Sequence, residues 1–291
     1  MSRRFFLIYL RILPVLRRLG YFRWKVVRKL ARSIYLRIRR GRVVKITFQG
    51  RRWWVPVQDK YFTPSLLLQG EYEPGETVLV QNTVRPGMVV LDIGAHVGYY
   101  TCLAAALTGP AGRVFAFEPM PFNRRLLQRN ITGRGYSWAT VVPMAVSDEP
   151  GSRDLHLNPI NSGDNRLTPL EQPGRKVPIR TIRIDDWLPP GLAVDFVKMD
   201  VQGWEWHALK GMQRLLEKNP RVILLVEVWP AGLESAGGNV EELVRLCGYY
   251  GLALHLFDGL QPGSLRRANV TDLLAASGSS RDAVNAVFRP L

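Results

Sequence analysis

Short apolar runs alternate with segments of helical periodicity from Val89 to the end of the chain. Apolar runs of about four to eight residues between turn signals predict strands, and unbroken runs predict central parallel strands that are buried on both faces. The pattern predicts strands over 89–93, 114–117, 141–146, 194–199, 222–228, 252–257 and 283–288. It predicts helices over 99–107, 121–131, 204–216 and 240–249. This succession is typical of a doubly wound α/β domain.

The N-terminal region has a different pattern. Residues 43–57 alternate between apolar and polar positions, which predicts a hairpin with its turn at Gln49 and Gly50. The preceding residues mix aromatic and aliphatic side chains with Arg and Lys, and Pro14 and Gly20 predict a break between two helices. The predicted organisation is therefore a basic amphipathic arm, a hairpin or linker region and an α/β domain, over residues 1–42, 43–77 and 78–291.

The formal charge of +16 is concentrated in that arm and the start of the hairpin. Between Met1 and Trp54 there are 17 Lys and Arg and no Asp or Glu, and the remainder carries 23 basic against 24 acidic residues. A catalytic cleft for nucleic acid is expected to make the α/β domain basic as well, so a nucleic acid substrate is disfavoured. A basic amphipathic helix with aromatic residues suits an anionic membrane surface. A helix packed on the protein and an RNA-binding arm are the alternatives for residues 1–42.

Cys102 and Cys247 both lie in apolar segments, and no CxxC or Cys/His spacing indicates a structural metal site. We therefore expect buried thiols, no metal and a reducing compartment. No uncharged apolar run reaches the roughly 18 residues that suggest a spanning helix, and no small-residue cleavage site follows the opening apolar segment. The expected location is cytoplasmic, with residues 1–42 as a candidate attachment to the inner face of the cell membrane.

The segment that begins at Val89 carries the first candidate chemistry. A predicted buried strand ends at Asp92, and Gly94 and Gly98 make the turn into a helix. Gly94 is expected to let the backbone approach a ligand where a Cβ would collide. The order D-x-G-x-x-x-G differs from the dinucleotide pattern G-x-G-x-x-G. An acid at this strand end would repel a pyrophosphate, whereas it suits the cationic methionyl part of S-adenosylmethionine.

A second acid, Glu118, ends the next predicted strand, 26 residues beyond Asp92. An acid about 20 residues after the glycine turn is the position from which Rossmann-type sites bind ribose hydroxyls. The alternative is that Glu118 only caps the helix that follows.

A third segment surrounds Asp200, at the end of the predicted fourth strand. Gly203 permits a tight turn into the helix that begins near Trp204, which places Asp200, Gln202 and Glu205 at the carboxyl edge of the sheet. A carboxylate there is a candidate general base for a hydroxyl, with His207 as a further candidate. Glu205 is equally well explained as an acid that complements the positive N-terminus of the helix. Glu227 ends the fifth predicted strand on the same edge and is a weaker candidate for the general base.

These motifs resemble a known family. The segments LDIGAHVGYYT, FAFEP, AVSDEPG, NSGDNRL, TIRIDDW and DFVKMDVQGWEWHALKG follow the order and spacing of the FkbM-type methyltransferases, over roughly Val78 to Leu291. The resemblance implies a Rossmann-like class I methyltransferase sheet, mostly parallel with an antiparallel last strand. It also implies an S-adenosylmethionine-dependent transferase, usually of the O-methyl type, that acts on a hydroxyl of a sugar, glycan or other small polar compound.

The resemblance also extends the predicted site. With Asp92, Gly94, Gly98 and Glu118, the expected cofactor-binding set includes Ala95, Thr101, Pro119, Ala145 and Val146. Many members carry Glu where this chain has Gln202, so any role of that acid as a base must fall to Asp200 or Glu205. Residues 161–166 form a polar loop that is a candidate cover for the site, although loops of this composition are more often plain turns.

Two other functions are compatible with the sequence. An RNA methyltransferase would use the basic arm, but no N-P-P-Y-like tetrapeptide follows the fourth predicted strand. A non-catalytic, membrane-associated cofactor-binding protein is the second alternative, against which the intact Asp92, Gly94 and Glu118 argue.

Overall fold

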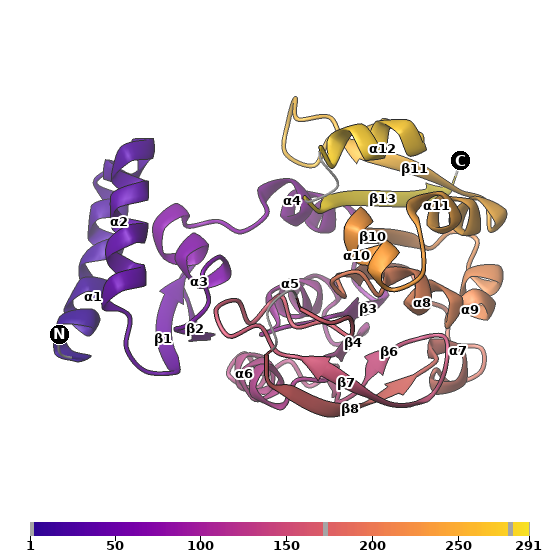
Figure 1. Cartoon of the computed structure of the whole chain (residues 1–291), viewed down its shortest axis with the longest axis horizontal. Helices are drawn as coiled ribbons and strands as arrows, with labels where there is room; N and C mark the ends of the chain where they lie inside the picture. The colour runs from indigo at the N-terminus through magenta and orange to yellow at the C-terminus, as the bar shows by residue number, and fades with distance from the viewer. Residues whose placement is uncertain (1–2, 171–173, 279–281, 291) are drawn as a thin grey trace. The chain divides into compact units, whose positions relative to one another are not determined.

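A computed structural model describes residues 3–170, 174–278 and 282–290 of the chain (Figure 1). The contacts divide the chain into two compact units. The smaller unit contains residues 1–74 together with Asn158–Asp164, and the larger unit contains Gly75–Leu157 and Asn165–Leu291. Each unit has its own buried core.

The larger unit is built on an eight-stranded sheet in the order β12-β11-β13-β10-β9-β3-β4-β5. Strands β5, β4, β3, β9 and β10 are parallel, whereas β13 runs antiparallel between β10 and β11. The strands are β3 (Val89–Ile93), β4 (Arg113–Phe117), β5 (Ala139–Val142), β9 (Phe196–Met199), β10 (Ile223–Val228), β11 (Leu252–Phe257), β12 (Leu265–Arg267) and β13 (Val284–Pro290). The predicted fold class, a mostly parallel Rossmann-like sheet with an antiparallel late strand, is confirmed.

Helices connect these strands and complete the layers of the larger unit. They are α4 (Pro74–Thr83), α5 (Tyr99–Thr108), α6 (Pro121–Thr132), α7 (Ile184–Trp187), α8 (Glu205–Lys210), α9 (Gln213–Lys218), α10 (Pro230–Ser235), α11 (Val240–Tyr249) and α12 (Val270–Ala276). The central strands β9 and β10 are almost wholly buried, as their unbroken apolar sequence predicts. Sequence patterning did not predict β12 or α12, which begins with a capping box between Asn269 and Asp272.

Two predicted elements were wrong in their extent. The strand predicted over 141–146 ends at Val142, because Pro143 has no N–H with which to continue the ladder. The chain then enters a second, three-stranded sheet in the order β6-β8-β7. Its strands are β6 (Ala145–Val146), β7 (Gly151–His156) and β8 (Lys176–Ile182).

The helix predicted over 204–216 is two helices, α8 and α9, separated at Gly211 and Met212. A Cβ on Gly211 would lie 2.0 Å from the carbonyl oxygen of Ser147. The backbone after β6 therefore passes directly against Gly211. This long-range contact has no signature in helical periodicity.

The smaller unit packs two helices on a hairpin. Its elements are α1 (Arg3–Arg18), η1 (Tyr21–Arg23), α2 (Lys25–Ile38), β1 (Val43–Phe48), β2 (Arg51–Pro56), α3 (Phe62–Pro64) and η2 (Ser65–Gln69). The predicted hairpin is confirmed, and positive φ values of 50° at Gln49 and 72° at Gly50 make its turn a type I′ turn.

The break predicted at Pro14 is wrong, since α1 continues through it, whereas the break at Gly20 is confirmed by a φ of 81°. A proline inside a helix costs about 3 kcal/mol or more. Leu10 and Leu13, which precede Pro14 in the same helix, are buried in the core of the unit, and their packing offsets that cost.

Candidate cofactor and catalytic site

The sheet order places the predicted site residues at a topological switch point. Strand β3 lies between β4 and β9, and the chain leaves β3 toward β4 and β5 before it returns to β9 on the other side. In open α/β sheets, ligands bind outside the carboxyl ends of the strands at such a point. Asp92 lies near the end of β3, Glu118 directly follows β4, and Asp200 directly follows β9.

Asp92 is buried between the two neighbouring strands, opposite Ala116 of β4 and Lys198 of β9. The hydroxyl of Thr101 on α5, a residue of the predicted cofactor-binding set, donates to its Oδ2 atom at 2.5 Å. Burial raises the pKa of Asp92 to about 6, although Thr101 and Lys198 oppose the rise. A cation bound beside Asp92 would favour its ionised form.

The turn after β3 is fixed by contacts within the protein. The N–H groups of Gly94 and Ala95 both donate to the carbonyl of Phe117 at 3.0 Å. Gly94 has a φ of 86°, and a Cβ there would lie 1.8 Å from the carbonyl oxygen of Asp200. At Gly98, with a φ of 90°, a Cβ would lie 2.4 Å from a methyl carbon of Leu127. The expected reason for Gly94 was the approach of a ligand, but the group that approaches it in the structure is the backbone of Asp200.

Glu118 joins that turn to the next helix. Its Oε2 accepts from the N–H of His96 and its Oε1 from the N–H of Met120, both at 2.8 Å. Burial raises the pKa of Glu118 to about 8 against the effect of these two bonds. A carboxylate has about four lone-pair sites, so two remain for other donors. The neighbouring Pro119 accepts from Arg124 at 3.0 Å through its carbonyl.

Ala145 and Val146 lie beyond the carboxyl end of β5, in β6. They pair with Thr181 and Ile182 of β8, and Val146 is buried in the main core. Along the carboxyl edge of the sheet, both residues therefore come next after Asp92 at β3 and Glu118 at β4. Their side chains carry no polar group with which to bind a ligand.

Asp200 belongs to a polar cluster at the ends of β9 and β10. Lys198 Nζ lies 3.5 Å from Oδ2 of Asp200, and Gln202 Nε2 donates to Oδ1 at 2.7 Å. The same Gln202 Nε2 donates to Oε2 of Glu227 at 2.5 Å. Burial alone would raise the pKa of Asp200, but Lys198 and the hydrogen bonds with Glu227 and Gln202 outweigh it and hold that pKa below its usual range. Asp200 is therefore ionised at neutral pH, with its side chain 26% exposed.

From the sequence, Gln202 and Glu227 were expected to have smaller roles in the site than the structure gives them. Gln202 has a φ of 54°, a conformation that non-glycine residues rarely adopt and that is often found at functional sites. In this conformation its amide bridges two acids that lie 27 residues apart in the chain. The position of Glu227 at a strand end was the one sequence signal for this bridge.

Glu205 lies within the protein, at the start of α8. It is fully buried, and its Oε1 accepts from the N–H groups of Val201 and Gly203 at 3.1 Å. Its Oε2 is buried without a hydrogen-bond partner in the described part of the chain. Burial raises the pKa of Glu205 to about 7. These contacts hold the turn that carries Asp200 and Gln202.

His207 faces a different group of residues. Its Nδ1 lies 2.9 Å from Oδ2 of Asp148 and its Nε2 lies 2.9 Å from the carbonyl of Ala236. Burial would raise the pKa of Asp148, but hydrogen bonds from Lys210 and His207 hold it below its usual range. Since both partners of the imidazole are acceptors, only the doubly protonated ring can donate to both. Both ring nitrogens of His207 are therefore occupied by groups of the protein.

The loop predicted as a cover for the site is divided between the two units. Residues 161–164 group with the smaller unit, where Ser162 donates to Oδ2 of Asp59 at 3.0 Å. Asn165 and Arg166 group with the larger unit, and the Arg166 guanidinium lies 4.6 Å from the ring centroid of Trp229. Among the residues that the structure describes, no cluster of three or more His, Cys, Asp or Glu has the arrangement of a metal site.

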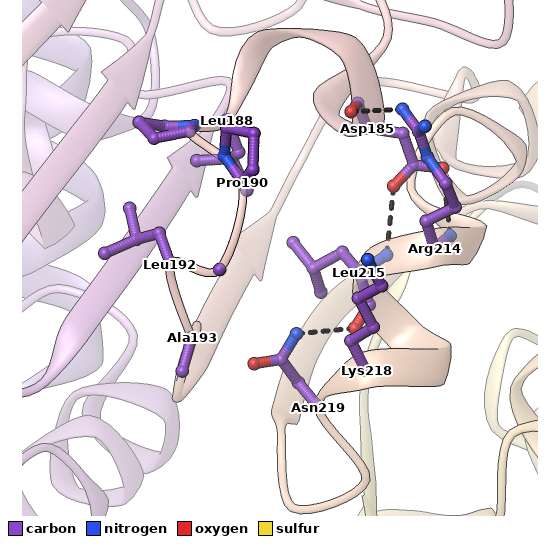
Figure 2. Close-up of a pocket in the computed structure, with 11 residues that line it drawn as sticks. Asp185, Leu188, Pro190, Leu192, Ala193, Arg214, Leu215, Lys218 and Asn219 are labelled. Atoms are coloured by element: carbon purple, nitrogen blue, oxygen red, sulfur yellow. Dashed lines mark hydrogen bonds between the residues drawn. The ribbon is translucent and has the colours of Figure 1, made fainter.

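A hollow of about 320 Å³ lies elsewhere in the larger unit (Figure 2). It is lined by residues 188–193, which precede β9, and therefore lies toward the amino ends of the strands. The carboxylate of Asp185 accepts from the N–H groups of Arg214 and Leu215, where it caps α9 (Figure 2). Asp185, the acid that lines this hollow, thus has a structural role. None of the predicted site residues lines the hollow.

Comparisons with known proteins show similarity to methyltransferases. The family model described as the methyltransferase FkbM domain matches residues 92–250. The hexuronic acid methyltransferase AglP of Haloferax volcanii is 30% identical over 139 residues, which cover 47% of this chain and 54% of AglP. The 31-O-demethyl-FK506 methyltransferase FkbM of Streptomyces tacrolimicus is 29% identical over 202 residues, which cover 59% of this chain and 75% of that enzyme. A ribosomal RNA large subunit methyltransferase E of Acidithiobacillus ferrooxidans is 30% identical over 114 residues, which cover 38% of this chain and 51% of that enzyme.

The matched region begins at Asp92 and ends at Tyr250, directly after α11. It contains Glu118, Asp200 and the whole switch point between β3 and β9, and it spans more than half of the 291 residues. The alignment with AglP spans about half the length of that relative. On the family match, the chain belongs to the FkbM family of S-adenosylmethionine-dependent methyltransferases.

Proposed function

We propose that this protein transfers the methyl group of S-adenosylmethionine to a hydroxyl of a sugar, a glycan or another small polar compound. The observation that carries the proposal is the ionised Asp200, held by Lys198 and Gln202 directly against the glycine turn. Methylation of a hydroxyl needs a group that accepts its proton, beside the methyl donor. Asp200 combines the correct charge, an exposed edge and a fixed orientation.

The acids of the switch point fit the cofactor. Asp92 supplies buried negative charge for its cationic methionyl part, and the two remaining lone-pair sites of Glu118 suit the ribose hydroxyls. The bound cofactor supplies an activated methyl group on its sulfonium. The protein must then align the acceptor oxygen with that group and exclude water.

We assign the proton acceptor to Asp200, rather than to Glu205 or His207. Glu205 is fully buried, and its Oε1 is occupied by two backbone N–H groups of the turn. Both ring nitrogens of His207 are engaged by acceptors of the protein, Oδ2 of Asp148 and the carbonyl of Ala236. Both residues therefore act as positioning groups, and Glu227 and Gln202 orient the Asp200 carboxylate.

The relatives favour an oxygen-rich acceptor. The name of AglP specifies a hexuronic acid, and that of the Streptomyces enzyme specifies an oxygen of FK506. The larger unit of this chain is close to neutral, with 22 basic and 20 acidic residues, and so lacks the strong positive charge that binds a nucleic acid backbone. The match to the ribosomal RNA enzyme makes RNA the alternative acceptor that the experiment must include.

The test is a transfer assay with isotope-labelled S-adenosylmethionine. The purified full chain is incubated with a panel of uronic acids, neutral glycosides, hydroxylated macrolides and total RNA. We expect label on a hydroxyl oxygen of at least one non-nucleic acid compound, located by NMR of the product. Label on RNA alone would contradict the proposed acceptor class.

A further inference from the structure

Helix α1 has two apolar faces, and one of them is exposed. Phe6, Leu10 and Leu13 are buried in the core of the smaller unit. A second row of large apolar side chains lies on the opposite side, between 46% and 66% exposed: Phe5, Ile8, Ile12, Val15 and Leu19. Their spacing alternates between three and four residues, which keeps them on one side of a helix.

Helix α2 adds a second exposed row, formed by Val26, Leu30 and Ile34 at intervals of four residues. The buried faces of α1 and α2 meet in one core. The Phe6 and Tyr35 rings lie 5.9 Å apart between centroids, and the Tyr9 hydroxyl donates to the carbonyl of Ala31. Both exposed rows therefore point away from the same core, and we refer to the two rows together as the apolar surface.

Cations lie beside this surface and acids do not. Arg4, Arg11 and Arg18 are exposed and recur at intervals of seven residues, next to the apolar row of α1. On the other helix, the exposed Lys29 and Arg37 adjoin the apolar row, and Lys25, Arg28, Lys29 and Arg32 line a hollow of about 190 Å³ on the side that faces η2. The sequence from Met1 to Trp54 contains no Asp or Glu. A partner of this surface must therefore offer both apolar groups and negative charge.

We propose that this surface, formed by the exposed rows of α1 and α2 with their flanking cations, binds an anionic lipid bilayer. None of the described helices is long and apolar enough to cross a membrane. A helix of this kind lies in the interface, with its apolar side chains below the headgroups and its cations at the lipid phosphates. Trp24, which is 71% exposed, is of the residue type that favours that interface.

An anionic bilayer accounts for both the exposed apolar rows and the cations beside them. RNA would pair with the arginines but would leave the aliphatic row of α1 in water. An acidic protein partner would need a complementary apolar groove as well. The inference concerns only residues of the smaller unit, so it extends the proposed function without depending on it.

The experiment is vesicle flotation of the full chain. Vesicles of phosphatidylcholine with phosphatidylglycerol are compared with vesicles of phosphatidylcholine alone. The apolar variant carries Ile8→Ser, Ile12→Ser and Val15→Ser, and the charge variant carries Arg4→Gln, Arg11→Gln and Arg18→Gln. The matched control carries Tyr249→Ser and Leu260→Ser, two residues of the larger unit that are 83% and 84% exposed.

We expect the wild type and the control to float with the anionic vesicles. Each cation near an anionic surface contributes about fivefold in affinity, so the charge variant should bind about a hundredfold more weakly and with a weaker salt dependence. Loss of three apolar side chains should also lower binding by more than about a hundredfold, at low and high salt alike. Because every replaced side chain is exposed, the unfolding temperature of both variants should match the wild type.

Three results would overturn the inference. They are a wild-type chain that ignores anionic vesicles, an apolar variant that floats as well as the wild type, and a chain that shifts RNA in a gel but does not float. None of them would affect the transfer assay, which tests residues of the larger unit.

Discussion

Replacement of Asp200 by Asn is expected to lower turnover by about 10²–10⁴-fold, the usual contribution of a general base. The amide has the shape of the carboxylate but cannot take the proton of a hydroxyl. Its neighbours Lys198 and Gln202 remain in place, so the affinity for S-adenosylmethionine should change by less than about threefold. Turnover and cofactor binding are measured separately, by the transfer assay and by calorimetry.

Asp195→Asn is the matched control for that variant. Asp195 stands at the amino end of β9, where its Oδ2 accepts from the N–H of Val89 at 2.8 Å. An amide oxygen can accept the same bond, so this variant should keep wild-type turnover. Full activity in Asp200→Asn would move the proton acceptor to Glu227, the acid that shares Gln202 with it.

Gly94→Ala is expected to destabilise the larger unit by about 2–6 kcal/mol, from backbone strain and overpacking together. The new Cβ would lie 1.8 Å from the carbonyl oxygen of Asp200, which is backbone and has no side-chain freedom with which to move aside. The displacement would also shift Asp200 itself. We therefore expect loss of both thermal stability and turnover in this variant.

Gly87→Ala separates the effect of backbone strain from the effect of overpacking. Gly87 has a φ of 85°, almost the value of 86° at Gly94, but nothing lies within 4 Å of its Cβ position. This variant therefore carries the conformational strain alone, about 1–2 kcal/mol. An equal loss of unfolding temperature in the two variants would contradict the close contact between Gly94 and the Asp200 backbone.

Much of the larger unit could be predicted because its signals are local. The strand that ends at Asp92, the turn at Gly98 and the strand that ends before Glu118 each lie within one short segment. Periodicity identified all the strands of the parallel sheet, and the family resemblance supplied the antiparallel position of β13.

Other features depend on contacts between distant segments. The contact of Gly211 with Ser147, which divides α8 from α9, joins positions 64 residues apart. The bridge from Gln202 to Glu227 and the burial of Glu205 likewise follow from packing at the carboxyl edge of the sheet. Residue type and strand-end position predicted Glu205 and His207 as candidate bases. What each of them can do is determined by the hydrogen-bond acceptors and donors that surround it in the structure.

The exposed row on α1 illustrates a different limit. The sequence showed apolar residues at helical spacing, but a row that faces the core and a row that faces solvent have the same spacing. Phe5 and Phe6 are adjacent in the chain, yet one is 61% and the other 1% exposed. That difference arises from the docking of α1 on α2 and η2.

The central claim is that Asp92 and Glu118 bind S-adenosylmethionine at the switch point. Its most direct test is calorimetric titration of the cofactor into the wild type, into Asp92→Ala and Glu118→Ala, and into the double variant. Each acid is expected to contribute about 1.5–3 kcal/mol through charge-assisted hydrogen bonds. We expect saturable binding to the wild type, a loss of at least about tenfold in each single variant, and no measurable binding in the double variant. Unchanged affinity in a folded double variant would contradict the assignment of these two acids.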